Sequence, residues 1–412
     1  MGSAGPPMDA SPDAGLTNGG VRPGPDGPRP APEGPRQAPG PDGMRRMDGN
    51  GNNRRRRRRG RSARPVSNSA PGAYQGAPPN APRQAPQPPQ MSGGPRGRRR
   101  RTRPGAERRR GGLEVLREMQ QAGVALDPTE RLKLELPAGE GNPPYGDRAT
   151  GRAIDLIAPI GRGQRCLIVA PPKTGKTRIL QCIAASVAYN HPEVGIYALL
   201  VDERPEEVTD FKRNTPANVI AASSDMSIED HIATAEYAME VVAAQVIEGK
   251  DVVLLLDSIT RLARAYNANT DGGGRTMSGG LDSNAMQAPR QIFGAARKIE
   301  DGGSLTIIGT ALVDTGSRMD QIIFEEFKGT GNSEIFLSRE LAERRIFPAI
   351  DIARSGTRKE EKLFPPDQLN LHQMLRRVLL QMPLQEAITK LADRLNKTKT
   401  NEEFFQLLRN NE

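Results

Sequence analysis

The stretch that decides the fold reads CLIVAPPKTGKT and covers residues 166–177. Its apolar first half predicts a buried strand from Cys166 to Ala170. A loop of Pro, Gly, Thr and Lys follows, and the apolar residues after Thr177 recur at helical spacing. This order of strand, loop and helix predicts a phosphate-binding loop, in which only the leading Gly of the usual motif is changed, to Ala170. The alternative is an ordinary strand–turn–helix connection without a ligand.

The loop contains the groups that nucleotide phosphates require. Backbone N–H groups of the loop and of the helix N-terminus can surround the phosphates. Lys176 supplies a positive charge to the β and γ phosphates, and the Thr177 hydroxyl can ligate Mg²⁺. We therefore expect ATP and Mg²⁺ to bind here.

Beyond this loop, short β-branched runs alternate with longer helical stretches, which predicts an α/β fold with a mostly parallel central sheet. The expected strands are Cys166–Ala170, Ile196–Asp202, Asn218–Ala221, Val252–Asp257 and Leu305–Ala311. The expected helices are Lys176–Tyr189, Ile228–Glu248 and Asn284–Glu300, with a short one near residues 113–123 and a helical C-terminal part after Asp367. Residues 127–150 are expected to follow an irregular path.

Two of these strands end in acidic residues, at the sheet edge where the loop also lies. Asp257 has the position of a Mg²⁺-binding carboxylate in P-loop enzymes, although such an Asp is often only a helix cap. Glu203 is the candidate general base that orients the attacking water. The alternative for Glu203 is a surface ion pair with its neighbour Arg204.

Other arginines are candidates for binding anions. Arg354 and Arg358 lie in the run RSGTR, and either could be the cation that ring ATPases supply to a neighbouring subunit's phosphates. The Gly-rich loops 271–280, with Arg275, and 314–318, with Arg318, have the small residues and single arginine expected of loops lining a polyanion channel. The alternatives are surface arginines and solvent loops.

Residues 1–112 differ in composition from the rest of the chain. They contain only nine Val, Ile, Leu, Met, Phe or Tyr residues, too few to form a core, so we expect a long disordered tail. Their 23 arginines and seven acidic residues give a net charge of +16, so that residues 113–412 carry −6 of the chain's +10. This polycation predicts salt-dependent binding of nucleic acid. The expected domains are the tail (1–112), a short helix and connector (113–150) and the ATPase domain with its helical end (151–412).

The composition also excludes several classes of protein. No stretch approaches 18 apolar residues, and the N-terminus lacks the apolar run of a signal peptide, so we expect a cytoplasmic protein without membrane contact. Cys166 and Cys182 lie in expected core elements, without a second Cys pair or a His at metal-ligand spacing. They are therefore expected to be buried apolar side chains.

Five motifs resemble those of the bacterial transcription termination factor Rho family, over about residues 127–408. They are Ile157–Thr177 (IAPIGRGQRCLIVAPPKTGKT), Asp202–Val208 (DERPEEV), Leu256–Asn267 (LDSITRLARAYN), Glu325–Asn332 (EEFKGTGN) and Arg354–Glu361 (RSGTRKEE). The resemblance implies a RecA-like P-loop ATPase domain in a homohexameric ring. Such a ring would hydrolyse ATP, translocate 5′ to 3′ along single-stranded RNA as a helicase, and release transcripts from RNA polymerase.

The resemblance also implies roles for individual residues. The nucleotide would be lined by Gly161, Arg162, Gly163, Gln164, Arg165, Cys166, Lys173, Thr174, Gly175, Lys176, Thr177, Arg178, Arg204 and Phe347. Mg²⁺ would be bound by Thr177 and Asp257, and catalysis would use Glu203, Lys176 and the next subunit's Arg358. RNA would contact Arg275, Gly279, Gly280, Thr315, Gly316, Ser317 and Arg318 in two loops of the central channel.

One feature departs from the family pattern. The family normally has an OB-like or cold-shock-like barrel ahead of the ATPase domain, whose aromatic residues stack on RNA. Residues 1–143 contain a single aromatic residue, Tyr74, so the primary RNA-loading site is expected to be absent or replaced by the Arg-rich tail. Two other functions stay open: a ring ATPase of secretion or rotary type, and a non-cycling RNA-binding regulator.

Overall fold

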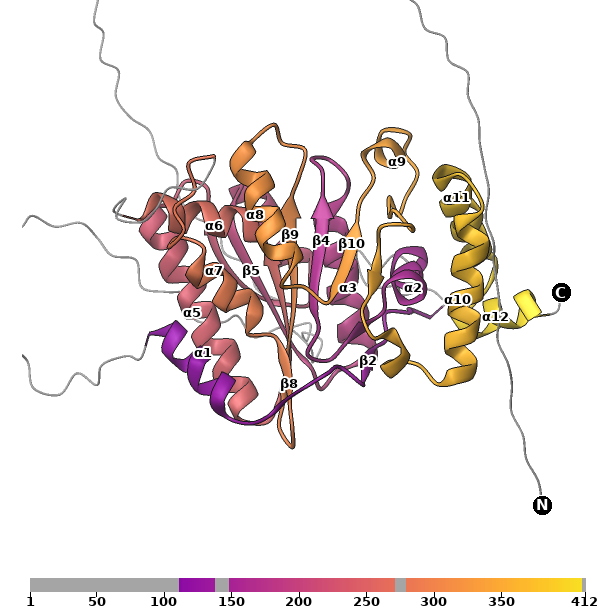
Figure 1. Ribbon diagram of the computed structural model, residues 1–412, viewed down its shortest axis with the longest axis horizontal. Coiled ribbons are helices and arrows are strands. Elements are labelled where there is room, and N and C mark those ends of the chain that lie inside the picture. The colour runs from indigo at the N-terminus through magenta and orange to yellow at the C-terminus, as the bar shows by residue number, and fades with distance from the viewer. Residues whose placement is uncertain (1–110, 138–147, 271–278, 410–412) are drawn as a thin grey trace, which may run out of the picture. The chain divides into compact units, whose positions relative to one another are not determined.

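The computed structural model describes residues 111–137, 148–270 and 279–409 (Figure 1). All of them belong to the unit Gly76–Glu412, the second of two units in the chain. The expected disordered tail up to residue 110, Arg275 and most of its loop, and residues 138–147 lie outside the described residues.

Within the described residues, nine strands form one sheet, ordered β11-β10-β4-β9-β7-β5-β6, with β8 pairing β9 and β1 pairing β8. Neighbouring strands from β10 to β6 are all parallel, whereas β11, β8 and β1 pair antiparallel. The strands are β1 (Ala125–Leu126), β4 (Arg165–Ala170), β5 (Gly195–Glu203), β6 (Asn218–Ser223), β7 (Asp251–Asp257), β8 (Arg297–Ile299), β9 (Ser304–Leu312), β10 (Ser333–Phe336) and β11 (Gly356–Thr357). A separate pair is formed by β2 (Arg131–Leu132) and β3 (Ile160–Gly161).

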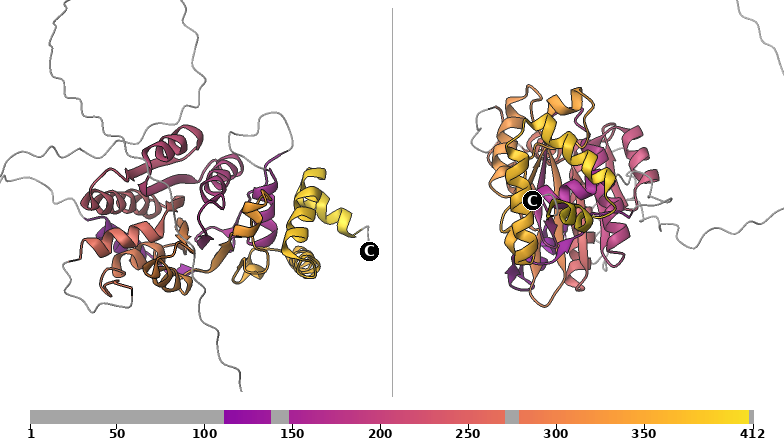
Figure 2. Two further views of the ribbon diagram at one scale, coloured as in Figure 1. Left: turned by 90° about the horizontal axis from the view of Figure 1, so that it is seen from above. Right: turned by 90° about the vertical axis from the view of Figure 1, so that its right-hand side faces the viewer.

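Helices cover both faces of the sheet, as the view from above in Figure 2 shows. On one face lie α1 (Gly112–Gln121), α5 (Ile228–Ile247), α6 (Ile259–Ala268), α7 (Gln287–Gly294) and α8 (Arg318–Lys328). The other core includes α2 (Arg148–Ile157), α3 (Lys176–Asn190), α4 (Pro205–Asn214), α9 (Arg339–Glu343), α10 (Pro366–Leu380), α11 (Leu384–Lys397) and α12 (Asn401–Arg409), with the short 3₁₀ helix Glu360–Lys362 beside α10. Among the helices placed in the structure, none has the length and apolarity needed to cross a membrane.

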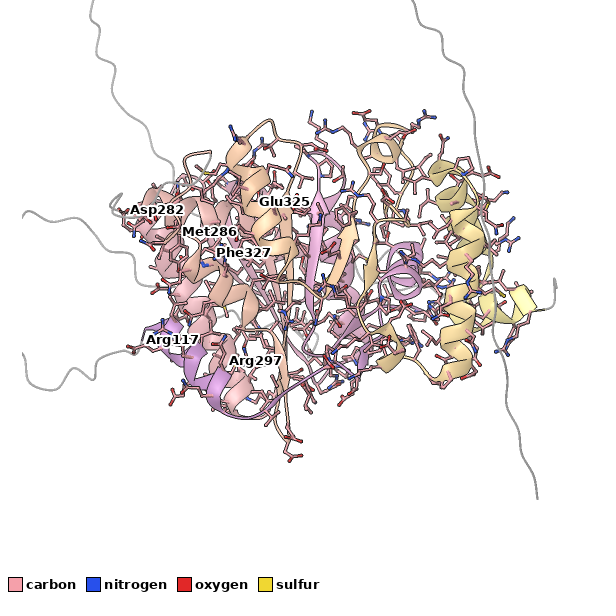
Figure 3. All side chains as sticks on the ribbon, viewed as in Figure 1. Arg117, Asp282, Met286, Arg297, Glu325 and Phe327 are labelled. Atoms are coloured by element: carbon pink, nitrogen blue, oxygen red, sulfur yellow. The ribbon has the colours of Figure 1, made fainter. Side chains whose placement is uncertain are left out.

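Two apolar cores hold these layers together because alternate side chains of each strand point to opposite faces. In β4, Cys166 and Ile168 pack into the core with α3, while Leu167 and Val169 pack into the core with α5. Met286 and Phe327 belong to the second core (Figure 3). This burial on both faces explains why the central strands are continuously apolar in sequence.

The α/β class, the mostly parallel sheet and the helical C-terminal part are confirmed. Both cysteines are buried, as expected. The expected helix Asn284–Glu300 is wrong in its second half, because α7 ends at Gly294 and residues 297–299 form β8. A tight turn joins β8 to β9: Asp301 has a φ of 53° and the Ile299 N–H donates to the Gly303 carbonyl. The sequence Asp-Gly-Gly at 301–303 was a hairpin signal that outweighs the helical spacing before it. Residues 127–150, expected to be irregular, contain β2 and the start of α2.

Candidate active site

The phosphate-binding loop connects the carboxyl end of β4 to the first turn of α3. Gly175 caps α3 with a φ of 90°, a left-handed conformation that Gly adopts without strain. The Thr174 hydroxyl donates to the Pro171 carbonyl at 2.7 Å and stiffens the loop. A Cβ atom at Gly175 would lie 3.6 Å from the ring of Phe347, so this half-exposed ring borders the loop. An aromatic ring in this position can stack on the base of a nucleotide whose phosphates lie on the loop.

Three charged side chains meet beside the loop. The Lys176 ammonium donates to Glu203 Oε1 at 2.8 Å and to Asp257 Oδ1. Burial would lower the pKa of Lys176, but the charges of Asp257 and Glu203 outweigh burial and hold that pKa above its ordinary value. Both carboxylates are almost fully buried, at the ends of β5 and β7. A phosphate group can draw Lys176 away and free two carboxylates for a metal ion and a water.

The side chains around this cluster fit Mg²⁺. Asp257 and Thr177 offer a carboxylate and a hydroxyl, the hard oxygen ligands that this ion prefers. In the described part of the chain, no group of three or more His, Cys, Asp or Glu side chains could hold a metal ion. Mg²⁺ is typically bound by one or two carboxylates together with substrate phosphates and water.

Glu203 does not form the surface ion pair with Arg204 that sequence left open. Arg204 is largely exposed and lies 3.7 Å from Glu207, on the first turn of α4. Glu203 points inward. The Arg261 guanidinium of α6 lies 3.6 Å from the Glu203 carboxylate and 3.5 Å from the Asp202 carboxylate. Arg261 was not predicted as a site residue, although its spacing of four residues after Asp257 puts it one helical turn into α6.

The structure does not bring Arg358 or residues 161–166 to the phosphate-binding loop of the same chain. Residues 161–166 lie at or before the amino end of β4, whose first residue, Arg165, is about 17 Å along the strand from Ala170 at roughly 3.3 Å per residue. Asn332 connects the two groups, because it accepts from the Arg165 N–H at 2.8 Å and from the Arg358 N–H at 2.9 Å. Cys166 is fully buried and cannot line an open site.

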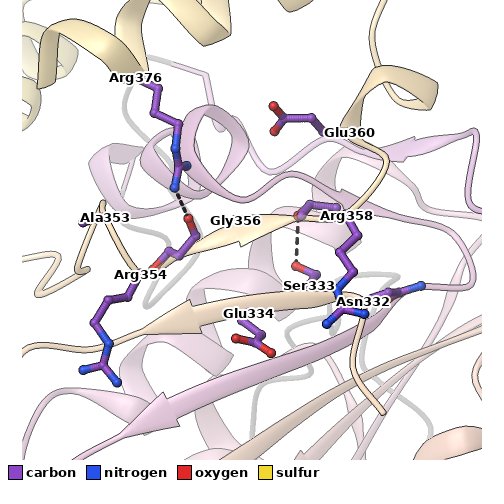
Figure 4. Close-up of a pocket in the computed structure, with 11 residues that line it drawn as sticks. Asn332, Ser333, Glu334, Ala353, Arg354, Gly356, Arg358, Glu360 and Arg376 are labelled. Atoms are coloured by element: carbon purple, nitrogen blue, oxygen red, sulfur yellow. Dashed lines mark hydrogen bonds between the residues drawn. The ribbon is translucent and has the colours of Figure 1, made fainter. Parts of the chain in front are cut away.

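A cavity of about 390 Å³ is lined by Asn332 and Arg358, among others (Figure 4). The exposed side chains of Arg354 and Arg358 enter it from the β11 side, and Glu334 of β10 lies between them. Burial raises the pKa of Glu334, although the nearby Arg358 opposes that shift. The guanidinium of Arg354 lies 4.1 Å from the Phe336 ring centroid. The cavity is thus lined by charges of both signs, in which arginines outnumber glutamates.

The second Gly-rich loop, residues 314–318, is held by α6 and α8. Asp320 is buried and accepts from Thr315 Oγ1 at 2.6 Å. Its carboxylate also accepts from Nε and Nη2 of Arg264. Ser317 caps α8, so Arg318 begins that helix and remains exposed. A Cβ atom at Gly279 would lie 3.3 Å from the Met319 N–H nitrogen, which puts the end of the first loop against the second.

A family model described as the ATP synthase alpha/beta family, nucleotide-binding domain, matches residues 151–357. Transcription termination factor Rho of Chromobacterium violaceum is 53% identical over 284 residues, covering 69% of this chain and 67% of that protein. The Haemophilus influenzae factor is 54% identical, with 69% and 66% covered. The Streptomyces lividans factor is 56% identical over 280 residues, but only 38% of its length is matched.

A solved structure of an ATPase from the type III secretion system of pathogenic bacteria has a TM-score of 0.54 at 22% identity, covering 69% of this chain and 85% of the other. At that identity the likeness shows a common fold alone. The sequence identity above one half, over about two thirds of both chains, is with the termination factors. The chain therefore belongs to the family of transcription termination factor Rho.

Proposed function

We propose that the chain is an ATP-dependent RNA translocase and helicase that assembles as a homohexamer, binds nascent RNA and releases transcripts from RNA polymerase. One observation carries the proposal: the cluster of Lys176, Glu203 and Asp257 lies at the carboxyl edge of the sheet, while Arg358 lies at the opposite end of β4. Arg358 is too far along the strand to reach the phosphates of its own chain. The site is complete only when a second copy supplies this arginine.

In this site each residue has one task. The loop N–H groups and Lys176 hold the phosphates, while Glu203 orients the attacking water and accepts its proton. Thr177 and Asp257 would hold Mg²⁺, which neutralises phosphate charge when it is bound. The next subunit's Arg358 stabilises charge in the transition state. Lys173, Thr174, Gly175, Arg178, Arg204 and Phe347 line the same nucleotide. Of residues 161–166, the partly exposed Arg162 and Arg165 belong to the surface that faces the neighbouring copy's nucleotide.

The loops ending at Gly280 and Arg318 serve RNA in the central channel. Thr315, Gly316 and Arg318 are exposed, while the Asp320 contacts fix the base of their loop. The Arg-rich tail holds RNA through its phosphates and reads little sequence. The resemblance to termination factors at above half identity supports this function over protein secretion, because the solved structure of a secretion ATPase at 22% identity shares a fold alone.

The test is ATP hydrolysis by the full-length protein with and without single-stranded RNA, together with displacement of a DNA strand annealed downstream on that RNA. We expect RNA to stimulate hydrolysis, and displacement to require ATP and RNA 5′ of the duplex. Hydrolysis that single-stranded RNA leaves unchanged would reject the RNA motor and favour another ring ATPase.

A further inference from the structure

Thr310 connects the sheet to the candidate metal ligand. It lies near the carboxyl end of β9, the strand between β4, which leads into the phosphate-binding loop, and β7, which ends in Asp257. Its hydroxyl Oγ1 lies 2.8 Å from Asp257 Oδ1. Thr310 is fully buried and Asp257 is 1% exposed, so water does not compete for this bond.

The hydroxyl has few other partners. The remaining acceptor near it is the Leu256 carbonyl, at the longer distance of 3.5 Å. A hydroxyl donates one hydrogen bond, and a buried carboxylate accepts a stronger bond than a neutral carbonyl. The proton of Thr310 therefore points to Asp257 Oδ1.

Within the described contacts, Asp257 Oδ1 accepts from two donors, Lys176 and Thr310. Lys176 must leave this oxygen when it moves to the phosphates of a bound nucleotide. Thr310 is part of the sheet and keeps its position. After the lysine has moved, the Thr310 hydroxyl is the contact that continues to fix Oδ1.

We propose that Thr310 is a positioning residue for Mg²⁺-nucleotide binding: its hydroxyl holds the Asp257 carboxylate in the orientation that accepts the metal. The inference rests on the proposed function, since it takes Asp257 as the metal ligand. A hydrogen bond to a metal-binding carboxylate typically changes metal affinity ten- to a hundredfold. Thr310→Val keeps the shape and strand preference of the side chain but removes the donor.

Thr306 provides the matched control. It lies on the same face of β9, four residues earlier, is equally buried, and accepts from the Gly163 N–H at 2.8 Å. Thr306→Val therefore removes a buried hydroxyl contact from the same strand but at the far end from Asp257. Thr310→Ser restores the donor in the test position.

The experiment measures binding of a fluorescent ATP analogue to the full-length protein, in EDTA and over a range of Mg²⁺ concentrations, with Mn²⁺ binding followed by EPR. Thr310→Val is expected to bind the analogue in EDTA like the unsubstituted protein. In the same variant, the Mg²⁺ concentration needed for tightening should rise roughly ten- to a hundredfold, with a matching loss of bound Mn²⁺. Thr310→Ser should return within a few-fold of the original, and Thr306→Val should not change the Mg²⁺ response.

A folded Thr310→Val protein, checked by circular dichroism, with an unchanged Mg²⁺ response would overturn the role of Thr310 alone. If that variant does not fold, Thr310→Ala is measured in the same way and decides the question by the same criterion. Failure of Thr310→Ser to recover the response would also reject the hydroxyl as the cause. Absence of any Mg²⁺ effect in the unsubstituted protein would instead overturn the metal role of Asp257 and with it the proposed site.

Discussion

Replacing Lys176 by Met should destabilise the protein even without nucleotide. The ammonium lies between Glu203 and Asp257, both almost fully buried, and its own side chain is only 15% exposed. Met has a similar length but no charge, so the substitution leaves two buried carboxylates facing each other. Breaking a buried pair in this way costs about 3–5 kcal/mol of unfolding free energy.

The measurement is urea unfolding of the full-length protein in EDTA, followed by circular dichroism, for Lys176→Met and for Lys173→Met. Lys173 lies in the same loop but is exposed, so its substitution should change the unfolding free energy by less than about 0.5 kcal/mol. Added Mg²⁺ should stabilise Lys176→Met more than the unsubstituted protein, because the ion can take the place of the ammonium between the carboxylates.

Equal unfolding free energies for the two variants would refute the reasoning. That outcome would mean that water already screens Glu203 and Asp257, so that the cluster is not a desolvated site. A Mg²⁺ effect that is the same in all proteins would refute the narrower claim that lysine and metal compete for one position.

Three further predictions concern other residues. Arg358→Ala alone and Lys176→Ala alone should each abolish ATP hydrolysis. Rings that contain both variants should recover part of the activity, because each copy supplies what its neighbour lacks. No recovery in verified mixed hexamers would count against a shared site. Arg318→Ala should reduce RNA stimulation of hydrolysis about tenfold with nucleotide affinity unchanged, and the exposed Arg344→Ala is the control. Burial raises the pKa of Asp155 to about 7, so its contribution to stability is present below about pH 4 and is lost as pH rises towards 7, by up to roughly 1.4 kcal/mol per pH unit. Asp155→Asn should flatten this slope in urea titrations at pH 5 and 7.5, and an unchanged slope would assign the loss to other groups.

The strands of the sheet were predictable because they are buried on both faces. The expected runs at Cys166–Ala170 and Val252–Asp257 differ from β4 and β7 by one residue at most. The strands β10 and β11 were not predicted, because residues 333–336 and 356–357 are short and give no periodic signal. The pairing of β10 with β4 and of β11 with β10 depends on contacts between residues distant in sequence, which no local pattern contains.

Part of the candidate site was likewise predictable from the sequence and part was not. The loop around Lys176 and the two strand-end carboxylates have local signals, and the structure brings all three together. Thr310 has no such signal, since a threonine in an apolar strand is an ordinary strand residue. Only the order of strands, with β9 beside β7, gives its hydroxyl a partner.

The position of β9 also suggests how the two parts of the site communicate. Its end is bonded to β7 through Thr310, and two residues later the Leu312 N–H donates to Thr260 Oγ1 of α6 at 2.9 Å. The strand then continues directly into the loop that begins at Asp314, whose base is tied to α6 again through Arg264 and Asp320. Asp257 and the loop proposed for RNA are therefore fixed to the same strand. Because a packed strand resists continuous deformation, this strand joins the two parts as one unit, which is the connection that the proposed coupling of hydrolysis to RNA movement requires.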